Sequence, residues 1–244
     1  MLEGMYSAAA GMEAQQQRMD VLSNDMANVN TTGYKSMRVA FRDLLYTQSG
    51  KGAAPGVQSG AGAAVTTLGR VDTQGSIQQT GRTLDVALEG SGYLQVRDPG
   101  NGLVLTRDGS LQRRVDGQLT TSSGQLVGVQ VPRNVDESQI KIGPDGRVFA
   151  ANRQVGRLNV VSVRAPEGLQ PLGDNNFRPT AASGPARAVT AGAQLQTGSL
   201  EASNVDMGNV MIDLMDAQRS YELASKAIST QDQMLDIANQ VKRS

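Results

Sequence analysis

A seven-residue repeat near the C-terminus most constrains what this chain can fold into. One row of the repeat consists of Met207, Leu214, Tyr221, Ile228 and Leu235. A second row, three residues later, consists of Val210, Ala217, Ala224 and Ala238, with Gln231 as its one polar member. Such a sustained heptad predicts a long helix that packs along another helix as a coiled coil, with small side chains where the backbones approach. Ser203, Asn204 and Asp206 are the candidate N-terminal caps of this helix.

The N-terminus carries a second narrow apolar stripe. Its members are Leu2, Met5, Ala9, Met12 and Met19, and after a small shift in phase Leu22, Met26 and Val29. Gln16 is the one polar interruption. The spacing predicts a helix of about 28 residues, roughly 40 Å long at 1.5 Å per residue. We expect the two stripes to pack on each other or on other molecules. The alternative is a self-contained globular protein with two long core helices.

The region between the stripes has no helical period. Residues 49–65 are rich in Gly, Ala and Ser and predict a connector. From about residue 75 to 197, short apolar runs alternate with turn formers, and Asp108-Gly109, Asp116-Gly117 and Asp145-Gly146 suggest tight hairpins. The predicted fold is therefore α+β: long N- and C-terminal helices pairing as a coiled coil, with a central antiparallel β-domain. The predicted domains are 1–46 (helix and elbow), 47–74 (connector), 75–197 (β-domain) and 198–244 (a helix packing on 1–30).

Composition excludes several classes of function. The chain has no His and no Cys, which excludes Ser-His-Asp and Cys-His catalysis, Cys/His zinc sites and disulfides. Its 23 Lys and Arg balance 23 Asp and Glu, so no net positive charge favours nucleic acid. No apolar run has the length of a membrane span or of a signal peptide. We predict no catalytic residues, no cofactor, no metal, no nucleic-acid partner and no membrane insertion.

The remaining polar motifs have simple structural interpretations. Gly90-Ser91-Gly92 predicts a tight turn rather than a nucleotide site, because no third Gly follows. Lys35, Arg38 and Arg42 predict a solvated face rather than a nucleic-acid patch. A pair of carboxylates for glycoside hydrolysis depends on spatial separation that a sequence does not show. A glycan-binding or hydrolysing β-domain on helical anchors is therefore kept as the alternative from another class.

The first helix ends where four small polar side chains precede a glycine. Asn28, Asn30, Thr31 and Thr32 compete with the helical backbone for hydrogen bonds, and Gly33 tolerates the left-handed conformation of a helix end. We define an elbow motif of Asn28, Thr32, Gly33, Tyr34 and Phe41. It turns the chain from the helix toward the β-domain, with Tyr34 and Phe41 as packing anchors. Whether residues 34–46 are helical or extended stays open.

Three separate segments resemble the bacterial flagellar rod and hook proteins. Ala27 to Lys35, followed by Phe41, resembles the N-terminal signature of that family. Segments 203–206, 218–222 and 226–230 are similar to its C-terminal signature, and 84–93 and 105–110 resemble its β-domain. Within the family, 43–46, 55–62 and 230–235 resemble the subfamily of the distal rod. A proximal rod or hook-type subunit is the alternative.

This resemblance implies a structural subunit rather than an enzyme. Copies would assemble into the helical tube that transmits motor torque to the hook, with the helices inside and the β-domain outside. The implied partners are further copies of the chain, other rod and hook proteins, and the flagellar type III export apparatus. The implied location is the basal body, in the periplasm or cell wall. The predicted assembly seam consists of Leu2, Met5, Ala9, Met12, Met19, Leu22 and Met26 on the first helix, and Met207, Val210, Leu214, Ala217, Tyr221, Ala224, Ile228 and Leu235 on the second.

Overall fold

The chain folds into two compact units. The computed structural model describes residues 2–43, 47–48, 58–59, 63–98, 100, 102–189 and 192–243. Unit 1 comprises Met1–Ala27, Met37–Leu68 and Asp206–Ser244, and unit 2 comprises Asn28–Ser36 and Gly69–Val205. Helices lie at both ends of the sequence and the region between them is almost entirely β, so the predicted α+β class is confirmed.

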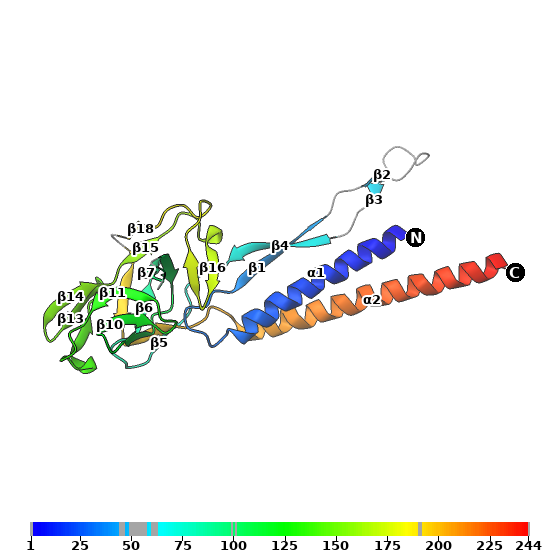
Figure 1. Ribbon diagram of the computed structural model, residues 1–244. Helices are drawn as coiled ribbons and strands as arrows, with labels where there is room; N and C mark the ends of the chain where they lie inside the picture. Colours follow the sequence, from blue (N-terminus) through cyan, green and yellow to red (C-terminus); the bar gives the residue numbers. More distant parts are fainter. Residues whose placement is uncertain are drawn as a thin grey trace. The chain divides into compact units, whose positions relative to one another are not determined.

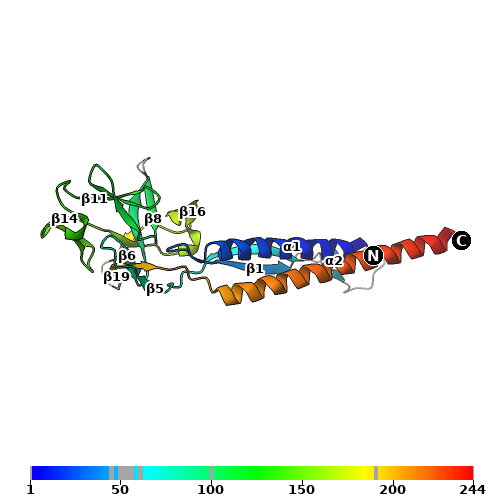
Figure 2. The same ribbon diagram turned by 90° about the horizontal axis from the view of Figure 1, so that it is seen from below.

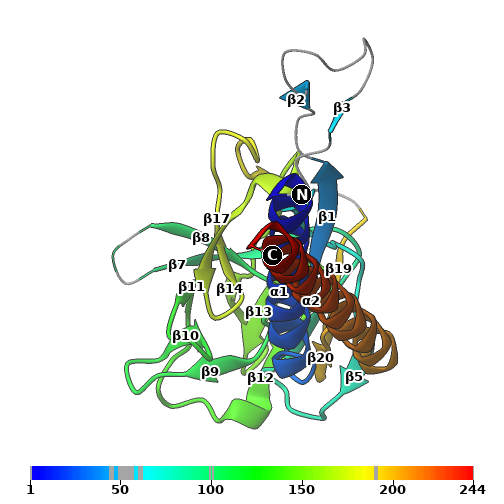
Figure 3. The ribbon, with the colours of Figure 1, turned by 90° about the vertical axis from the view of Figure 1, so that its right-hand side faces the viewer.

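Unit 1 contains the two long helices. α1 (Leu2–Ala27) and α2 (Met207–Arg243) lie side by side and antiparallel, with both termini of the chain at the same end of the unit (Figures 1 and 3). Of the three candidate caps, Asp206 is the one that caps α2. Its Oδ1 accepts hydrogen bonds from the backbone N–H groups of Gly208 (2.9 Å) and Asn209 (3.2 Å).

Small side chains form the closest contact of unit 1. Ala14 of α1 and Ala217 of α2 are 3% and 0% exposed, and Leu22 and Val210 are buried too. Arg18 Nη2 lies 2.7 Å from Asp213 Oδ1 and links the two helices at the edge of this contact. Because alanine adds little bulk, the backbones can approach closely here. The two helices therefore pack along each other within unit 1, and their pairing as a coiled coil stays a prediction.

A strand accompanies the first helix. β1 (Met37–Asp43) runs beside α1 and pairs with β4 (Ala63–Arg70) (Figure 2). The Asp25 carboxylate of α1 accepts the backbone N–H of Met37 at 3.2 Å. Residues 37–43 are thus extended, and residues 44–46 of the segment left open by the sequence lie outside the described residues. β2 (Thr47–Gln48) pairs with β3 (Gln58–Ser59), while the rest of the predicted connector up to residue 62 lies outside the described residues.

Unit 2 is built from antiparallel strands. The largest sheet has the strand order β16 (Gln170–Gly173), β17 (Asn176–Arg178), β8 (Leu103–Thr106), β7 (Tyr93–Arg97), β11 (Leu126–Gln130), β10 (Gln118–Thr121) and β9 (Leu111–Arg113). Outside this order, β15 (Val160–Ser162) pairs with both β7 and β18 (Arg187–Ala188). A second sheet consists of β12 (Ile140–Ile142), β13 (Arg147–Ala150) and β14 (Arg153–Arg157). The two remaining pairs are β19 (Gln194–Thr197) with β6 (Val86–Glu89), and β20 (Ser199–Glu201) with β5 (Ile77–Gln79). Short 3₁₀ turns lie at Glu137–Gln139 and Pro166–Gly168.

The core of unit 2 is aliphatic, as the scarcity of aromatic residues requires. Its main cluster is formed by Leu, Val and Ile side chains from most of these strands, and Leu105 belongs to a smaller cluster with Tyr93 and Phe177. Two of the three predicted hairpins are confirmed, because Gly117 and Gly146 have φ of 87° and 83° between paired strands. The third is wrong. Gly109 has no positive φ and joins two unpaired strands, and a Cβ there would lie 1.6 Å from the Val86 carbonyl oxygen.

Candidate functional site

The face of α2 that points away from α1 carries a stripe of exposed apolar side chains. We call it the outer stripe, and it consists of Ile212, Met215, Leu223, Met234, Ile237 and Val241. At about 100° per residue, Ile237 lies roughly 180° around the helix from the buried Val210. Ile212, Ile237 and Val241 are 56%, 61% and 71% exposed. Exposed apolar side chains gathered on one face of a helix mark an interaction surface rather than scattered surface residues.

The outer stripe continues where α1 does not accompany α2. α2 has 37 residues and α1 has 26, and the last turns of α2 extend past the N-terminal end of α1 (Figure 1). Met234, Ile237 and Val241 belong to these turns. Their apolar side chains therefore have no helix of this chain to cover them within the part of unit 1 that the structure describes.

The predicted seam of α2 lies mainly on the face toward α1. Val210 and Ala217 are buried, Leu214, Ala224, Ile228 and Leu235 are half-buried, and Met207 and Tyr221 are exposed. Val210 and Ala217 thus lie in the contact with α1, and the role of the predicted seam in assembly stays a prediction. The outer stripe escaped the sequence analysis because its apolar members are interrupted by Arg219, Lys226 and Thr230 and show no unbroken repeat.

Most of the predicted seam of α1 lies away from the helix face that Ala14 occupies. Leu22 is buried, Met5, Met12, Met19 and Met26 are half-buried, Ala9 is exposed, and the side chain of Leu2 lies outside the described residues. The deepest position, Ala14, was not predicted. It lies roughly 160° around the helix from Met12 at 100° per residue. Its neighbours on that face include Arg18 and Asp25, so a search for apolar side chains passes over it.

The elbow motif is divided between the two units. Asn28, Thr32, Gly33 and Tyr34 belong to unit 2, whereas Phe41 belongs to β1 of unit 1, is 43% exposed and lies 5.9 Å from the Arg18 guanidinium. Tyr34 is buried as an anchor should be. Phe41 is only partly covered, because a solvent-facing strand position replaces the packing site that was expected.

Gly33 joins the elbow to the β-region. Its φ is 66°, as predicted, but α1 ends six residues earlier at Ala27, so Gly33 does not close the helix. Its N–H donates to the Glu201 carbonyl at 2.8 Å, and a Cβ would lie 2.6 Å from the Arg107 carbonyl carbon. Beside it, Thr32 Oγ1 donates to Asp108 Oδ1 at 2.9 Å. Close approach to the backbone that follows β8 is therefore a second reason for glycine at this position.

Three charged side chains meet in the interior of unit 2. This junction cluster consists of Lys35, Arg107 and Glu201, whose side chains are 2%, 1% and 0% exposed. Lys35 Nζ lies 2.6 Å from Glu201 Oε1, and Arg107 Nη1 lies 2.9 Å from Glu201 Oε2. The prediction that Lys35 belongs to a solvated face is wrong, although Arg38 and Arg42 are exposed. Lys35 is buried because its carboxylate partner comes from a strand 166 residues further along the chain.

Backbone groups complete the junction cluster. Lys35 Nζ also donates to the Thr73 carbonyl at 2.6 Å, and Arg107 Nη2 donates to the Gly90 carbonyl at 3.0 Å. The N–H of Gly75 donates to Glu201 Oε1 at 3.0 Å. Burial lowers the pKa of Lys35 from its ordinary value, and its hydrogen bond with Glu201 opposes that shift. One carboxylate thus compensates two buried cations, and removal of that carboxylate leaves both without a counter-charge.

Tyr93 lies against the junction cluster and makes the stability of the fold depend on pH. The Arg107 guanidinium lies 5.6 Å from its ring centre, and its hydroxyl donates to Asp72 Oδ1 at 3.1 Å. Burial, followed by the nearby Asp72 charge, raises the pKa of Tyr93 well above its ordinary value. Above about pH 10 the unfolded chain loses this proton and the folded chain keeps it, so stability falls as the pH rises.

We expect Tyr93→Phe to remove this part of the pH dependence. The wild-type chain should lose up to about 1.4 kcal/mol of unfolding free energy per pH unit above about pH 10 through Tyr93. The variant should lose correspondingly less. Lys35 acts with the opposite sign, since its lowered pKa makes stability rise with pH, but it is present in both chains. Urea unfolding at several pH values measures the difference, with Tyr6→Phe at an exposed position as the control. Equal slopes for wild type and Tyr93→Phe would contradict the assignment.

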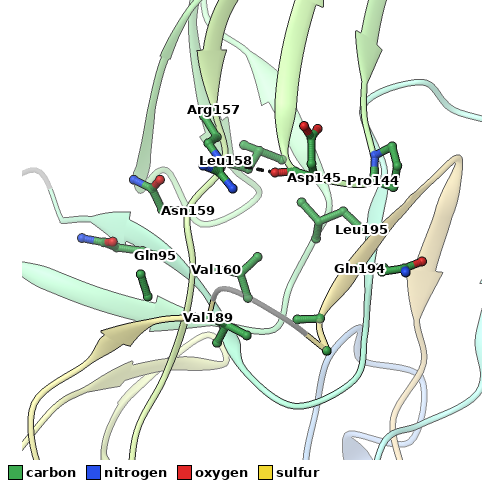
Figure 4. Close-up of a pocket in the computed structure, with 13 residues that line it drawn as sticks. Gln95, Pro144, Asp145, Arg157, Leu158, Asn159, Val160, Val189, Gln194 and Leu195 are labelled. Carbon is green, nitrogen blue, oxygen red and sulfur yellow. Dashed lines mark hydrogen bonds between the residues drawn. The ribbon is translucent and has the colours of Figure 1, made fainter.

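Unit 2 also has a hollow of about 650 Å³ between the turn after β12 and the strands β7, β15 and β19 (Figure 4). Leu158, Val160 and Leu195 contribute apolar surface, and Gln95 and Asn159 contribute amides. Asp145 is the one acidic residue among those that line the hollow, and its carboxylate is 2.9 Å from Arg147 Nε. Glycoside hydrolysis requires two carboxylates across a sugar, so this lining does not provide its catalytic pair.

Two other kinds of site are absent among the described residues. In the described part of the chain, no three or more acidic side chains are grouped so that they could hold a metal ion. Neither described helix has the length and hydropathy of a membrane span. The outer stripe and the junction cluster are therefore the two features on which a function can be argued.

Comparison with known proteins gives matches in three regions. Residues 5–35 match the family model "Flagella basal body rod protein", residues 87–150 match "Flagellar hook protein FlgE/F/G D1 domain", and residues 196–241 match "Flagellar basal body rod FlgEFG protein C-terminal". Each member of the junction cluster lies in a different one of these regions: Lys35 in the first, Arg107 in the second and Glu201 in the third.

Whole-chain relatives agree with these matches. The chain is 35% identical over 264 residues to the flagellar basal-body rod protein FlgG of Borreliella burgdorferi, with 100% of both chains covered. It is 35% identical over 263 residues to the protein of the same name from Caulobacter vibrioides, covering 99% of this chain and 100% of the relative. The flagellar hook-basal body complex protein FlhP of Bacillus subtilis is 36% identical over 273 residues, at 99% and 100% coverage.

Proposed function

Since this chain belongs to the family of flagellar basal-body rod proteins, we propose that its copies assemble through the helices of unit 1 into the helical tube of the rod. The chain is a structural subunit of the flagellar rod, as its resemblance to the family predicted. The observation that carries the proposed mode of assembly is the outer stripe. The described residues of unit 1 leave this apolar row exposed, another molecule can bury it, and further copies are present wherever the rod is built.

The outer stripe favours repeated head-to-tail contacts. Its final members lie on turns of α2 that extend past α1, while its first members lie beside the cap of α2. A stripe with members near both ends of the helix offers one copy contacts at both ends. Heterologous contacts whose rotation does not close produce an open helical filament. Fully burying one Ile or Leu of the stripe would contribute about 1.5–3 kcal/mol.

The position of the chain along the rod, its export route and its partners are inferred from its family. The resemblance of three short segments and the full-length relatives favour the distal part of the rod, in the periplasm or cell wall. In that setting the chain reaches its place through the flagellar type III export apparatus and contacts other rod and hook proteins. A family of structural proteins also argues against an enzyme. Electron cryo-microscopy of basal bodies tests the position directly, and density for this chain only in the proximal rod or the hook would contradict it.

Ile237→Asp tests the outer stripe. We expect this variant to abolish filament formation and motility, because a carboxylate cannot be buried in an apolar contact without a partner. The far-UV circular dichroism of the dilute monomer should stay unchanged, since Ile237 is 61% exposed there. Electron microscopy of basal bodies and swimming assays measure the effect. Gln240→Asp adds the same charge at an exposed polar position of the same turns and should assemble normally. Normal rods with Ile237→Asp would refute the proposed surface.

A further inference from the structure

Asn204 binds two other backbone segments of unit 2 through one side chain. Its Nδ2 donates to the carbonyls of Val71 (2.9 Å) and Thr73 (3.2 Å) and to Thr73 Oγ1 (3.1 Å). Its Oδ1 accepts the N–H of Ser36 at 2.8 Å, and its own N–H donates to the Tyr34 carbonyl at 3.3 Å. The amide therefore joins segments 34–36, 71–73 and 204 at one point.

These three segments lie at three of the four places where the chain passes between its two units; the fourth is at Ala27–Asn28. The chain leaves unit 2 after Ser36, returns at Gly69 and leaves again after Val205. The N–H of Val71 donates to the Ser36 carbonyl at 2.9 Å, so the first two segments are also bonded directly. The third segment follows β20, which ends at Glu201 of the junction cluster. Three of the four crossings thus lie within a few residues of one group of hydrogen bonds.

The junction cluster reinforces the same place. Lys35 precedes Ser36 in the first segment, and its ammonium contacts the Thr73 carbonyl of the second segment and Glu201 of the third. The Glu201 carboxylate also accepts the N–H of Gly75. Charged hydrogen bonds of this kind, buried away from water, are stronger than neutral ones and hold fixed geometry.

We propose that Asn204, supported by Lys35 and Glu201, cross-links the three connecting segments so that they leave unit 2 as one stiff bundle. This role rests on the proposed function as a rod subunit. Separate extended segments resist stretching but can bend and twist through rotation about φ and ψ. Segments bonded side by side resist bending and twisting together. A subunit that transmits torque needs connecting segments that resist bending and twisting. Asn204 is the residue that positions these segments beside one another.

The experiment compares full-length Asn204→Ala with wild type by amide hydrogen exchange. Exchange at Ser36 and Val71 should accelerate about tenfold or more, because the variant loses several hydrogen bonds at one point. Exchange at Val96 and Leu105 in the main sheet should stay unchanged. Asn134→Ala, an exposed asparagine of unit 2, should leave every one of these amides at its wild-type rate. If Asn204→Ala folds poorly, Thr73→Val removes a single acceptor and should accelerate the same two amides to a smaller extent.

A second measurement tests the mechanical role in cells. Strains with Asn204→Ala should assemble rods and hooks in normal number, but their swimming speed should fall more steeply than wild type as the viscosity of the medium rises. Unchanged exchange at Ser36 and Val71 would overturn the cross-link, and faster exchange with normal swimming at high viscosity would overturn its mechanical role. A different observation would contradict the proposed function as a rod subunit: the wild-type chain would be absent from isolated rods.

Discussion

Glu201→Gln is expected to destabilise unit 2 by about 3–5 kcal/mol, the typical cost of removing one partner from a buried ion pair. The substitution preserves the volume and shape of the side chain but removes the charge that compensates Lys35 and Arg107. Both cations have side chains at most 2% exposed, so water cannot replace the carboxylate. Urea unfolding of the full chain, followed by the near-UV circular dichroism of its buried tyrosines Tyr34 and Tyr93, measures the loss.

Two further variants separate charge from packing in this experiment. Asp145→Asn removes the acidic partner of the exposed Arg147 and should change stability by about 0.5 kcal/mol or less. Glu201→Gln combined with Lys35→Met removes one of the two unpaired cations and should recover part of the lost stability. A Glu201→Gln chain as stable as Asp145→Asn would show that the junction cluster does not depend on its charge.

Ala217→Glu is expected to separate the two helices of unit 1. Ala217 is fully buried against α1, and a glutamate there would have to displace the neighbouring helix or bury its carboxylate, at a cost of about 3 kcal/mol or more. Helices with narrow apolar stripes depend on packing for their stability. The ellipticity at 222 nm of the dilute chain should therefore fall, and motility should be lost.

The same substitution ten residues later serves as the control. Ala227 lies on the exposed surface of α2, so Ala227→Glu should retain wild-type helicity. These variants also distinguish the contact between α1 and α2 from the outer stripe. Ala217→Glu is expected to reduce helicity, whereas Ile237→Asp is expected to stop assembly without loss of helicity. Equal ellipticity for Ala217→Glu and Ala227→Glu would contradict the contact between α1 and α2.

The sequence was most informative where structure depends on local period and turn chemistry. The heptad that begins at Met207 predicted both α2 and the burial of Val210 and Ala217, because the side chains of one helix face must recur at helical spacing. Asp116-Gly117 and Asp145-Gly146 predicted hairpins, because a positive φ in a short turn favours glycine. The family resemblance was also correct, since it depended on the order of residues alone.

The sequence was misleading where a contact joins distant segments. Asp108-Gly109 has the same composition as the two true hairpins, yet Gly109 is required because the Val86 carbonyl approaches it from another strand. Asn204 looked like a helix cap, because asparagine before a helix usually is one, but its amide is bonded to Val71, Thr73 and Ser36. In both cases the partner lies too far along the chain for spacing to reveal it.

By itself, the sequence determined the class of the protein: two stripe-bearing helices around an antiparallel β-region, without the side chains of common catalytic or zinc sites. Only the tertiary structure decided which faces of the helices stay exposed and where Lys35 belongs. The physical reason is that helical period and turn preference are properties of neighbouring residues. The burial of a charge depends instead on a counter-charge that folding brings from elsewhere, as Glu201 is brought to Lys35 and Arg107.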